Sequence, residues 1–307
     1  MRELQLKQTN TKIPSIAVGC MRIDSMEIPA LVQHIEFCVE QGLTYFDHAD
    51  IYGGGNCEIL FGKAFKETDV KREDIFVQSK CGIVPGVMYD LSKKHILESV
   101  DGILKRLDME YLDALVLHRP DALVEPEEVA AAFDELEKSG KVRHFGVSNQ
   151  KPMQIELLKR YVKQPIEIDQ LQLSIPCSNM ITNGMEVNMA SEGAVDRDGS
   201  VLDYCRLNDI TIQAWSPFQY GFFEGVFIGN EEKYPKLNAV LNELADKYNV
   251  SPSGIATAWI LRHPAGIQMI AGSTSRKHMQ EIIDGSHVTL TREEWYRLYL
   301  AADHMLP

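Results

Sequence analysis

Four side chains that could take part in proton transfer lie at or just after the ends of predicted buried strands in the first half of the chain. They are Asp47, Tyr52, Lys80 and His118. Buried ionisable groups are costly unless they are paired, so four of them at the ends of neighbouring strands indicate one shared site. A phenol, an ammonium group, a carboxylate and an imidazole together are suited to moving one proton to or from a carbonyl oxygen.

Each of these residues has an expected role in such a site. Lys80 would lower the pKa of Tyr52 by stabilising the phenolate, and Asp47 would keep Lys80 charged as a buried counter-ion. His118 would donate a hydrogen bond to the substrate oxygen. Taken singly, each residue type more often has a structural role, such as a helix cap, a packed ring or a lysine that reaches water. Their convergence favours the site.

Eight short apolar segments are predicted to form the strands that position these residues. They are residues 15–21, 44–49, 74–80, 111–118, 142–149, 167–175, 211–218 and 266–273. Helical periodicity lies between most of them, and strand alternating with helix predicts a parallel sheet. An open doubly wound sheet normally carries Gly-x-Gly-x-x-Gly after its first strand, and this chain does not. We therefore predict an α/β fold, a single-domain (β/α)8 TIM barrel over residues 1–307 with an N-terminal strand pair.

Two connections are longer than is usual for this fold, residues 176–200 and residues 219–235. Both follow a predicted strand, so both are expected on the C-terminal face of the barrel, where the active sites of such barrels lie. We interpret them as candidate lids.

Composition and charge exclude several classes of protein. The 307-residue chain has a net charge of -13 and a pI near 5.2, which argues against nucleic acid as a partner. No apolar run approaches the roughly 20 residues needed to cross a bilayer, and no secretory signal is visible, so we expect no membrane partner and a cytoplasmic location. The six cysteines are scattered without zinc-site spacing, so we expect reduced thiols and no metal.

Three segments resemble the aldo-keto reductase family. They are "TYFDHADIYG" at residues 44–53, "FVQSK" at residues 76–80 and "LVLHRP" at residues 115–120. The resemblance covers essentially the whole chain and is most similar to a bacterial branch of uncharacterised cytoplasmic reductases. It implies that Asp47, Tyr52, Lys80 and His118 form the family's catalytic tetrad.

The resemblance also implies a cofactor, NADPH rather than NADH, bound across the barrel mouth. Ser148, Asn149 and Gln170 resemble the residues that hold the nicotinamide carboxamide, and Trp215 resembles the aromatic residue that stacks on its ring. The remaining implied cofactor contacts are Gly19, Met21, Ser216, Phe218, Gly221, Gly272, Ser273, Thr274 and Arg276. The segment from Ser273 to Arg276 is also a reasonable phosphate site on physical grounds, because a predicted helix begins there.

Three positions depart from the family's pattern. Asp169 stands where the family commonly has Asn, Gly272 where many members have a phosphate-binding Lys, and Ile282 where an Asn commonly contacts adenine. These departures weaken the inferred cofactor site, whereas the catalytic set is intact.

We therefore expect NADPH-dependent reduction of aldehydes or ketones, with Tyr52 as the proton donor and a small carbonyl compound as the substrate. One alternative is an NADPH-binding sensing subunit with little turnover. Another is a metal-dependent hydrolase that uses Asp47, His48, Asp50 and His118, although the chain lacks the His-x-His pair that such a site needs. Family habit implies a monomer or a weak homo-oligomer.

The substrate pocket is expected to be partly apolar. Its predicted walls are Cys20, Met21, Arg22, His48, Cys81 and the two long connections. Arg22 or Arg119 would attract an acidic substrate unless each is already paired with a carboxylate at the rim.

Overall fold

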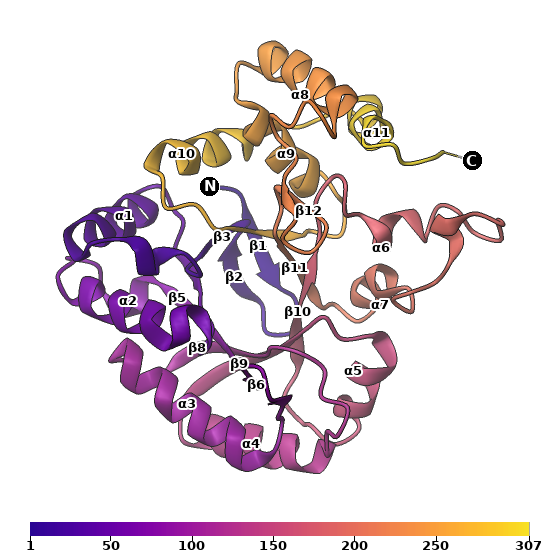
Figure 1. Cartoon of the computed structure of the whole chain (residues 1–307). Helices are drawn as coiled ribbons and strands as arrows, with labels where there is room; N and C mark the ends of the chain where they lie inside the picture. Colours follow the sequence, from indigo (N-terminus) through magenta and orange to yellow (C-terminus); the bar gives the residue numbers. More distant parts are fainter. Residues whose placement is uncertain (307) are drawn as a thin grey trace.

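Eight parallel strands close into a barrel, and helices surround it (Figure 1). The computed structural model describes residues 1–306. Around the barrel the strands follow the order β3, β4, β5, β8, β9, β10, β11, β14, so each strand pairs with its neighbours along the chain. All eight correspond to the predicted segments, and the predicted (β/α)8 TIM barrel is confirmed.

The elements have the following bounds. The strands are β1 Glu3–Leu6, β2 Thr11–Pro14, β3 Ile16–Gly19, β4 Tyr45–Asp47, β5 Phe76–Cys81, β6 Ile83–Val84, β7 Met88–Tyr89, β8 Leu112–Leu117, β9 Val142–Ser148, β10 Ile166–Gln172, β11 Thr211–Trp215, β12 Gln219–Tyr220, β13 Gly225–Val226 and β14 Gln268–Ala271. The α-helices are α1 Ile28–Glu40, α2 Asn56–Lys66, α3 Lys93–Leu107, α4 Pro126–Lys138, α5 Pro152–Lys159, α6 Asn179–Thr182, α7 Val201–Leu207, α8 Pro235–Tyr248, α9 Pro252–Leu261, α10 Arg276–Gly285 and α11 Arg292–Ala301. The short 3-10 helices are η1 Ile23–Ser25, η2 Tyr52–Gly55, η3 Arg72–Asp74 and η4 Glu192–Ala194.

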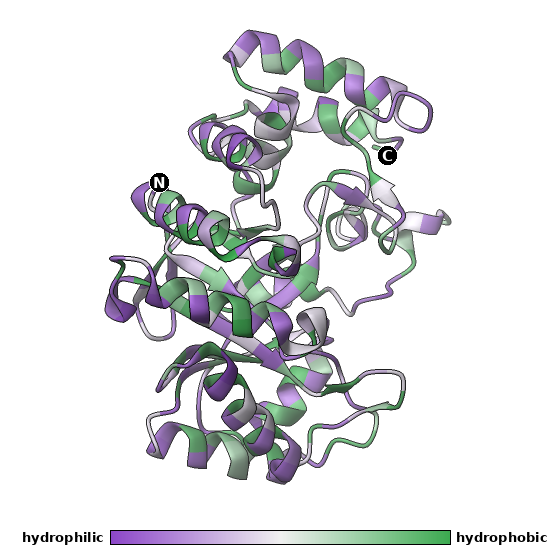
Figure 2. Cartoon of the chain, turned by 60° about the vertical axis from the view of Figure 1, so that its left-hand side comes forward, coloured by the Kyte–Doolittle hydropathy of each residue, from purple (hydrophilic) through white to green (hydrophobic). Residues whose placement is uncertain are grey.

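Helix starts follow local chemistry. Helix α3 begins after Ser92, whose side chain accepts a hydrogen bond from the backbone N–H of His95. Helices α4, α5 and α9 begin at Pro126, Pro152 and Pro252. Proline is tolerated there because a backbone N–H in the first turn would have no acceptor within the helix. Both hydrophilic and hydrophobic residues occur along the outer helices (Figure 2), as expected of helices with one face on the barrel.

The N-terminal strand pair closes one end of the barrel. Strands β1 and β2 pair antiparallel and lie in the middle of the ring of strands in Figure 1. Leu6 and Ile13 from this pair are buried in a cluster with the barrel residues Tyr45 and Ile168. The strand pair therefore covers the barrel interior at its N-terminal end and leaves the C-terminal end free for a site.

Four buried glutamine side chains lie in the barrel interior. Gln78, Gln170, Gln213 and Gln268 are all buried, and we call them the glutamine network. The Gln213 side-chain nitrogen donates to Gln268 at 2.8 Å, and the Gln78 and Gln170 side-chain nitrogens each donate to Gln213 at 2.9 Å. Gln268 in turn donates to the backbone oxygen of Pro14 at 2.7 Å. A chain of hydrogen bonds therefore runs up the barrel from the N-terminal strand pair.

The two long connections fold differently. Residues 219–235 form the hairpin β12–β13 over the barrel mouth. Residues 176–200 contain α6 and η4, and this connection packs on the C-terminal segment, where the Thr182 and Tyr299 hydroxyls lie 2.9 Å apart. A further hairpin, β6–β7, follows β5 and was not predicted.

Candidate active site

The Lys80 ammonium group is held between Asp47 and Tyr52. Its Nζ lies 2.8 and 2.9 Å from the two carboxylate oxygens of Asp47, 3.0 Å from the phenolic oxygen of Tyr52 and 2.7 Å from the backbone oxygen of His48. Asp47 and Lys80 come from adjacent strands, β4 and β5, and both are buried. The three residues therefore form one connected group at the C-terminal ends of these strands.

The glutamine network reaches this group. Asp47 Oδ1 accepts a hydrogen bond from the Gln78 side chain at 2.6 Å and from the Gln170 side chain at 3.1 Å. These two amides therefore hold the Asp47 carboxylate in position beside Lys80.

Charges and burial set the protonation states of this group. Burial by itself lowers the pKa of Lys80, but Asp47 and then Tyr52 outweigh it and raise that pKa above 10.5. Burial raises the pKa of Tyr52 above 10.0, because the opposing effect of Lys80 is too small to cancel it. Lys80 lowers the pKa of Tyr52, as expected from the sequence, but burial outweighs this effect and the net pKa is raised. Tyr52 therefore keeps its proton at neutral pH.

His118 follows β8 and faces the same group. Its ring lies edge-on to that of Tyr52, with 6.0 Å between the centroids. Burial, followed by the charges of Lys80 and Arg119, lowers the pKa of His118 well below 6.5. A neutral imidazole in this place can orient a substrate oxygen by a hydrogen bond without competing for the proton of Tyr52.

A cavity of about 870 Å³ opens over these residues. The predicted site residues that line it are Gly19, Met21, Asp47, Tyr52, His118, Ser148, Gln170, Trp215, Ser216, Phe218, Gly272 and Ser273. The predicted residues that do not line it are Lys80, Asn149, Gly221, Thr274 and Arg276. Lys80 does not line the cavity but donates a hydrogen bond to the phenolic oxygen of Tyr52, so the structure brings all four predicted catalytic residues together.

The four residues expected around a nicotinamide are also connected. The Trp215 indole N–H donates to Asn149 Oδ1 at 3.3 Å, and the Asn149 side-chain nitrogen donates to Ser148 Oγ at 2.7 Å. Ser148 donates to the backbone oxygen of Gln170 at 2.9 Å. Asn149 therefore orients its neighbours from behind the cavity wall.

The predicted phosphate contacts are only partly assembled. Ser273 lines the cavity, whereas the guanidinium carbon of Arg276 lies 4.6 Å from the centre of the Phe37 ring. His278, two residues later on α10, does line the cavity. The backbone oxygen of Gly221 accepts a hydrogen bond from Gln172 at 2.6 Å.

Part of the predicted pocket wall is wrong. Cys20, His48 and Cys81 are buried and do not line the cavity. His48 follows Asp47 in the chain, and successive side chains at a strand end point to opposite faces, so His48 packs against Phe61 outside the barrel. None of residues 176–200 lines the cavity, so this connection is not a wall of the site.

Several wall residues were not predicted individually. Tyr89 comes from the hairpin β6–β7, and Phe222, Phe223 and Val226 come from the hairpin β12–β13. The Trp215 ring stacks on Phe223 at a centroid distance of 6.1 Å. The Gly-rich, aromatic stretch "QYGFFEGVF" was the available signal for this hairpin, since its glycines permit a tight turn beside exposed aromatic rings.

Asp169 is completely buried, and its two carboxylate oxygens have no hydrogen-bond partner among residues 1–306. It neighbours Gln170, which faces the barrel interior, so Asp169 faces the helices. Burial raises the pKa of Asp169 well above its ordinary value, although the nearby backbone N–H groups of Gln150 and Asn149 lower it. Burial therefore favours the neutral form of the Asp169 carboxyl group.

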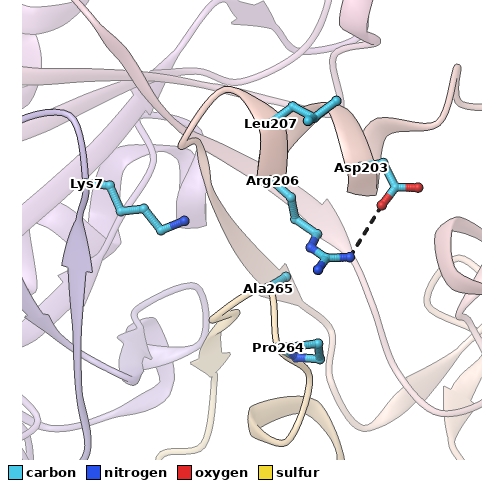
Figure 3. A pocket seen from close by; sticks show the side chains of 6 residues that line it. All are labelled: Lys7, Asp203, Arg206, Leu207, Pro264 and Ala265. Atoms are coloured by element: carbon cyan, nitrogen blue, oxygen red, sulfur yellow. Dashed lines mark hydrogen bonds and ion pairs between the residues drawn. The ribbon is translucent and has the colours of Figure 1, made fainter.

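A second hollow of about 510 Å³ lies at the other end of the barrel (Figure 3). Its charged side chains are already paired, Arg206 with Asp203 at 3.5 Å and Lys7 with Asp209 at 3.0 Å. Within residues 1–306, no cluster of three or more His, Cys, Asp or Glu side chains is placed to hold a metal ion, and no helix has the length and apolar character to span a membrane.

The family model described as "Aldo/keto reductase family" matches residues 15–301. The chain belongs to the aldo/keto reductase family. It is 37% identical over 282 residues to a Bacillus subtilis protein named uncharacterized oxidoreductase YcsN, a match that covers 88% of this chain and 87% of that protein. It is 32% identical over 304 residues to a 6-dehydroglucose reductase of Agrobacterium fabrum, with 95% of each protein covered.

Solved structures show the same likeness. The crystal structure of the thermostable aldo-keto reductase Tm1743 with the inhibitor epalrestat matches with a TM-score of 0.77 and 26% identity, covering 98% of this chain and 100% of that one. The family resemblance inferred from the sequence is therefore confirmed, and this aldo/keto reductase is an oxidoreductase.

Proposed function

We propose that this aldo/keto reductase reduces aldehydes or ketones with NADPH and that Tyr52 donates the proton. The observation that carries the proposal is the position of the Lys80 ammonium group, in contact with both Asp47 and the phenolic oxygen of Tyr52 beneath an open cavity. A reduced nicotinamide, when bound, supplies the hydride that such a reduction needs.

The chain's own residues would perform the remaining steps. His118 would hold the carbonyl oxygen beside Tyr52, and Tyr52 would give its proton to that oxygen as negative charge develops on it. Lys80 would stabilise the resulting phenolate, and Asp47 would keep Lys80 charged throughout. The aromatic residues Phe222 and Phe223 would exclude water from the cavity.

The cavity fits a nicotinamide cofactor. Trp215 offers an aromatic face, and Gln170 uses its side-chain nitrogen for Asp47 and Gln213 while its Oε1 accepts no hydrogen bond from residues 1–306. A side-chain carbon at Gly272 would meet only the backbone oxygen of Gly19, at 3.9 Å, so the wall has room there. The preference for NADPH is proposed from Ser273, Thr274 and Arg276 around the start of α10.

Fluorescence titration tests cofactor binding first. We expect tighter binding of NADPH than of NADH, followed by oxidation of NADPH when 4-nitrobenzaldehyde is added. Equal affinities would contradict the NADPH preference. Binding without oxidation of the cofactor by any carbonyl compound would instead favour the sensing subunit.

The variant Tyr52→Phe tests the proton donor. We expect kcat to fall by at least about 10²-fold while the Kd for NADPH stays within experimental error, because only the donated proton is lost. Tyr89→Phe is the matched control, since it removes another phenol of the same cavity. Similar losses in both variants would contradict the role of Tyr52.

A further inference from the structure

Arg119 is a cation in the cavity wall without a carboxylate partner. It is half-buried and directly follows His118. One of its terminal nitrogens lies 3.2 Å from the backbone oxygen of His118 and 3.5 Å from Ser148 Oγ, and its guanidinium carbon lies 5.8 Å from the centre of the Trp215 ring. Within residues 1–306, no carboxylate oxygen lies within 4.0 Å of its nitrogens. The possibility that Arg119 is salt-bridged at the rim is thereby removed.

The rest of the cavity does not supply the missing negative charge. The other fully charged residues in its lining are Asp47 and Arg22, and Asp47 is already paired with Lys80. Arg22 is exposed and also has no carboxylate partner within residues 1–306. A protein with a net charge of -13 therefore presents an excess of positive charge in its cavity. A guanidinium group stays protonated even when it is partly buried, so an anionic ligand is favoured here.

The location of Arg119 separates this anion from the phosphates of a cofactor. Arg119 follows β8, whereas Gly272 and Ser273 follow β14, and four steps around the eight-stranded barrel lie between β8 and β14 in either direction. These strands are on opposite sides of the barrel. The neighbours of Arg119 are Tyr52, Tyr89 and His118, so it lies at the end of the cavity where the carbonyl group is expected to react.

We propose that Arg119 makes this enzyme selective for carbonyl substrates that carry a carboxylate or a similar anionic group, an inference that rests on the proposed reductase function. The planar guanidinium group can donate two parallel hydrogen bonds to a carboxylate, which fixes orientation as well as affinity. The Trp215 ring and the Tyr89 ring flank the position and provide an apolar wall for the substrate's carbon skeleton. Arg22 at the rim adds a longer-range attraction that salt weakens.

Paired substrates test the proposal. The 2-, 3- and 4-carboxybenzaldehydes are compared with their methyl esters, which have the same aldehyde but no charge, and the measured quantity is the ratio of kcat/KM for acid and ester. For the best isomer we expect a ratio of at least about 10 in the wild type, the effect of a charge-assisted hydrogen bond. The ratio should fall about 10-fold or more in Arg119→Gln and should be kept only in part in Arg119→Lys, which retains the charge but not the two parallel donors.

The ratio cancels any general loss of activity in a variant. Arg143→Gln is the matched control, because Arg143 also lies over an aromatic ring, at 3.7 Å from the centre of Tyr111, but at the opposite end of the barrel. Its ratio should equal that of the wild type.

Three results would overturn the proposal. Ratios near 1 for all three isomers in the wild type would remove the selectivity and leave the reductase function intact. An unchanged ratio in Arg119→Gln, together with weaker NADPH binding, would assign Arg119 to the cofactor. No oxidation of NADPH with any of the six compounds would overturn the reductase function and this inference with it.

Discussion

The Lys80 ammonium nitrogen lies 3.0 Å from the phenolic oxygen of Tyr52, and Lys80 is fully buried whereas Tyr52 is half-buried and lines the cavity. An ammonium group in such a place loses its proton unless a counter-ion stabilises it, and Asp47 provides that counter-ion. The proposed proton donor Tyr52 and the Lys80 group that tunes it therefore both depend on a carboxylate that makes no hydrogen bond to Tyr52.

The variant Asp47→Asn should reveal this dependence in a pH profile. Without Asp47, burial lowers the pKa of Lys80, so Lys80 loses its charge at a lower pH than in the wild type. We expect kcat to fall by about 10²-fold at pH 8 and to recover partly as the pH is lowered to 6. The measurement is kcat from pH 5.5 to 9 with saturating NADPH. Parallel profiles for the variant and the wild type would show that Asp47 acts in another way.

Asp50 should make the stability of the fold depend on pH near neutrality. Burial, and then the nearby Glu58, raise the pKa of Asp50 from 3.8 to about 7. Because the folded-state pKa is the higher one, the contribution of Asp50 to stability is complete below pH 3.8 and is lost as the pH rises through 7. Asp50→Asn removes this loss. The difference in the free energy of unfolding between Asp50→Asn and the wild type should therefore increase in favour of the variant by on the order of 2–4 kcal/mol from pH 4 to pH 8.

Urea denaturation at a series of pH values measures this gain. Asp69→Asn is the control, because it makes the same substitution at an exposed carboxylate. A constant difference for Asp50→Asn would mean that the Asp50 carboxyl is ionised throughout.

His48 should be replaceable by an apolar residue with a gain in stability. Both of its ring nitrogens are buried without a hydrogen-bond partner among residues 1–306, and the ring packs edge-on against Phe61 at 4.5 Å between centroids. His48→Leu should raise the free energy of unfolding at pH 7 by about 1–2 kcal/mol, because no unsatisfied polar group stays buried. The midpoint of chemical denaturation measures this gain in stability.

The pH dependence of the same variant gives an independent check. Burial lowers the pKa of His48 from 6.5 to about 3, so the free energy of unfolding falls further as the pH drops from 6.5 toward 3, where the unfolded chain binds a proton at His48 that the folded chain does not. The advantage of His48→Leu should therefore grow in acid. His263→Leu is the control. It should lower the free energy of unfolding at pH 7, because His263 Nδ1 accepts a hydrogen bond from the backbone N–H of Ala265 at 3.2 Å. A stability loss in both variants would show that His48 has a partner after all.

The barrel could be predicted from the sequence because its signal is repeated. Eight apolar segments alternate with amphipathic helices, and a single error in one segment would not have changed the conclusion. The positions of Asp47, Tyr52, Lys80 and His118 followed from that topology, since parallel strands bring their C-terminal ends to one face.

What could not be predicted depends on single residues or on contacts distant in sequence. The hairpins β6–β7 and β12–β13 are two residues per strand, too short for any periodicity to indicate them. The outward direction of His48 requires the exact end of β4, which a sequence pattern does not fix. The raised pKa of Tyr52 depends on its burial, and its neighbours Lys80 and His118 come from strands distant in sequence.

The glutamine network has a consequence for how this sequence can change over time. Replacing Gln213 alone by an apolar residue would leave amide groups of Gln78, Gln170 and Gln268 without their partner in a dry interior. Simultaneous substitution of all four glutamines by apolar residues should therefore destabilise the fold less than substitution of one of them alone. Relatives of this enzyme should divide into those that keep all of these amides and those that have an apolar interior, with few sequences between the two.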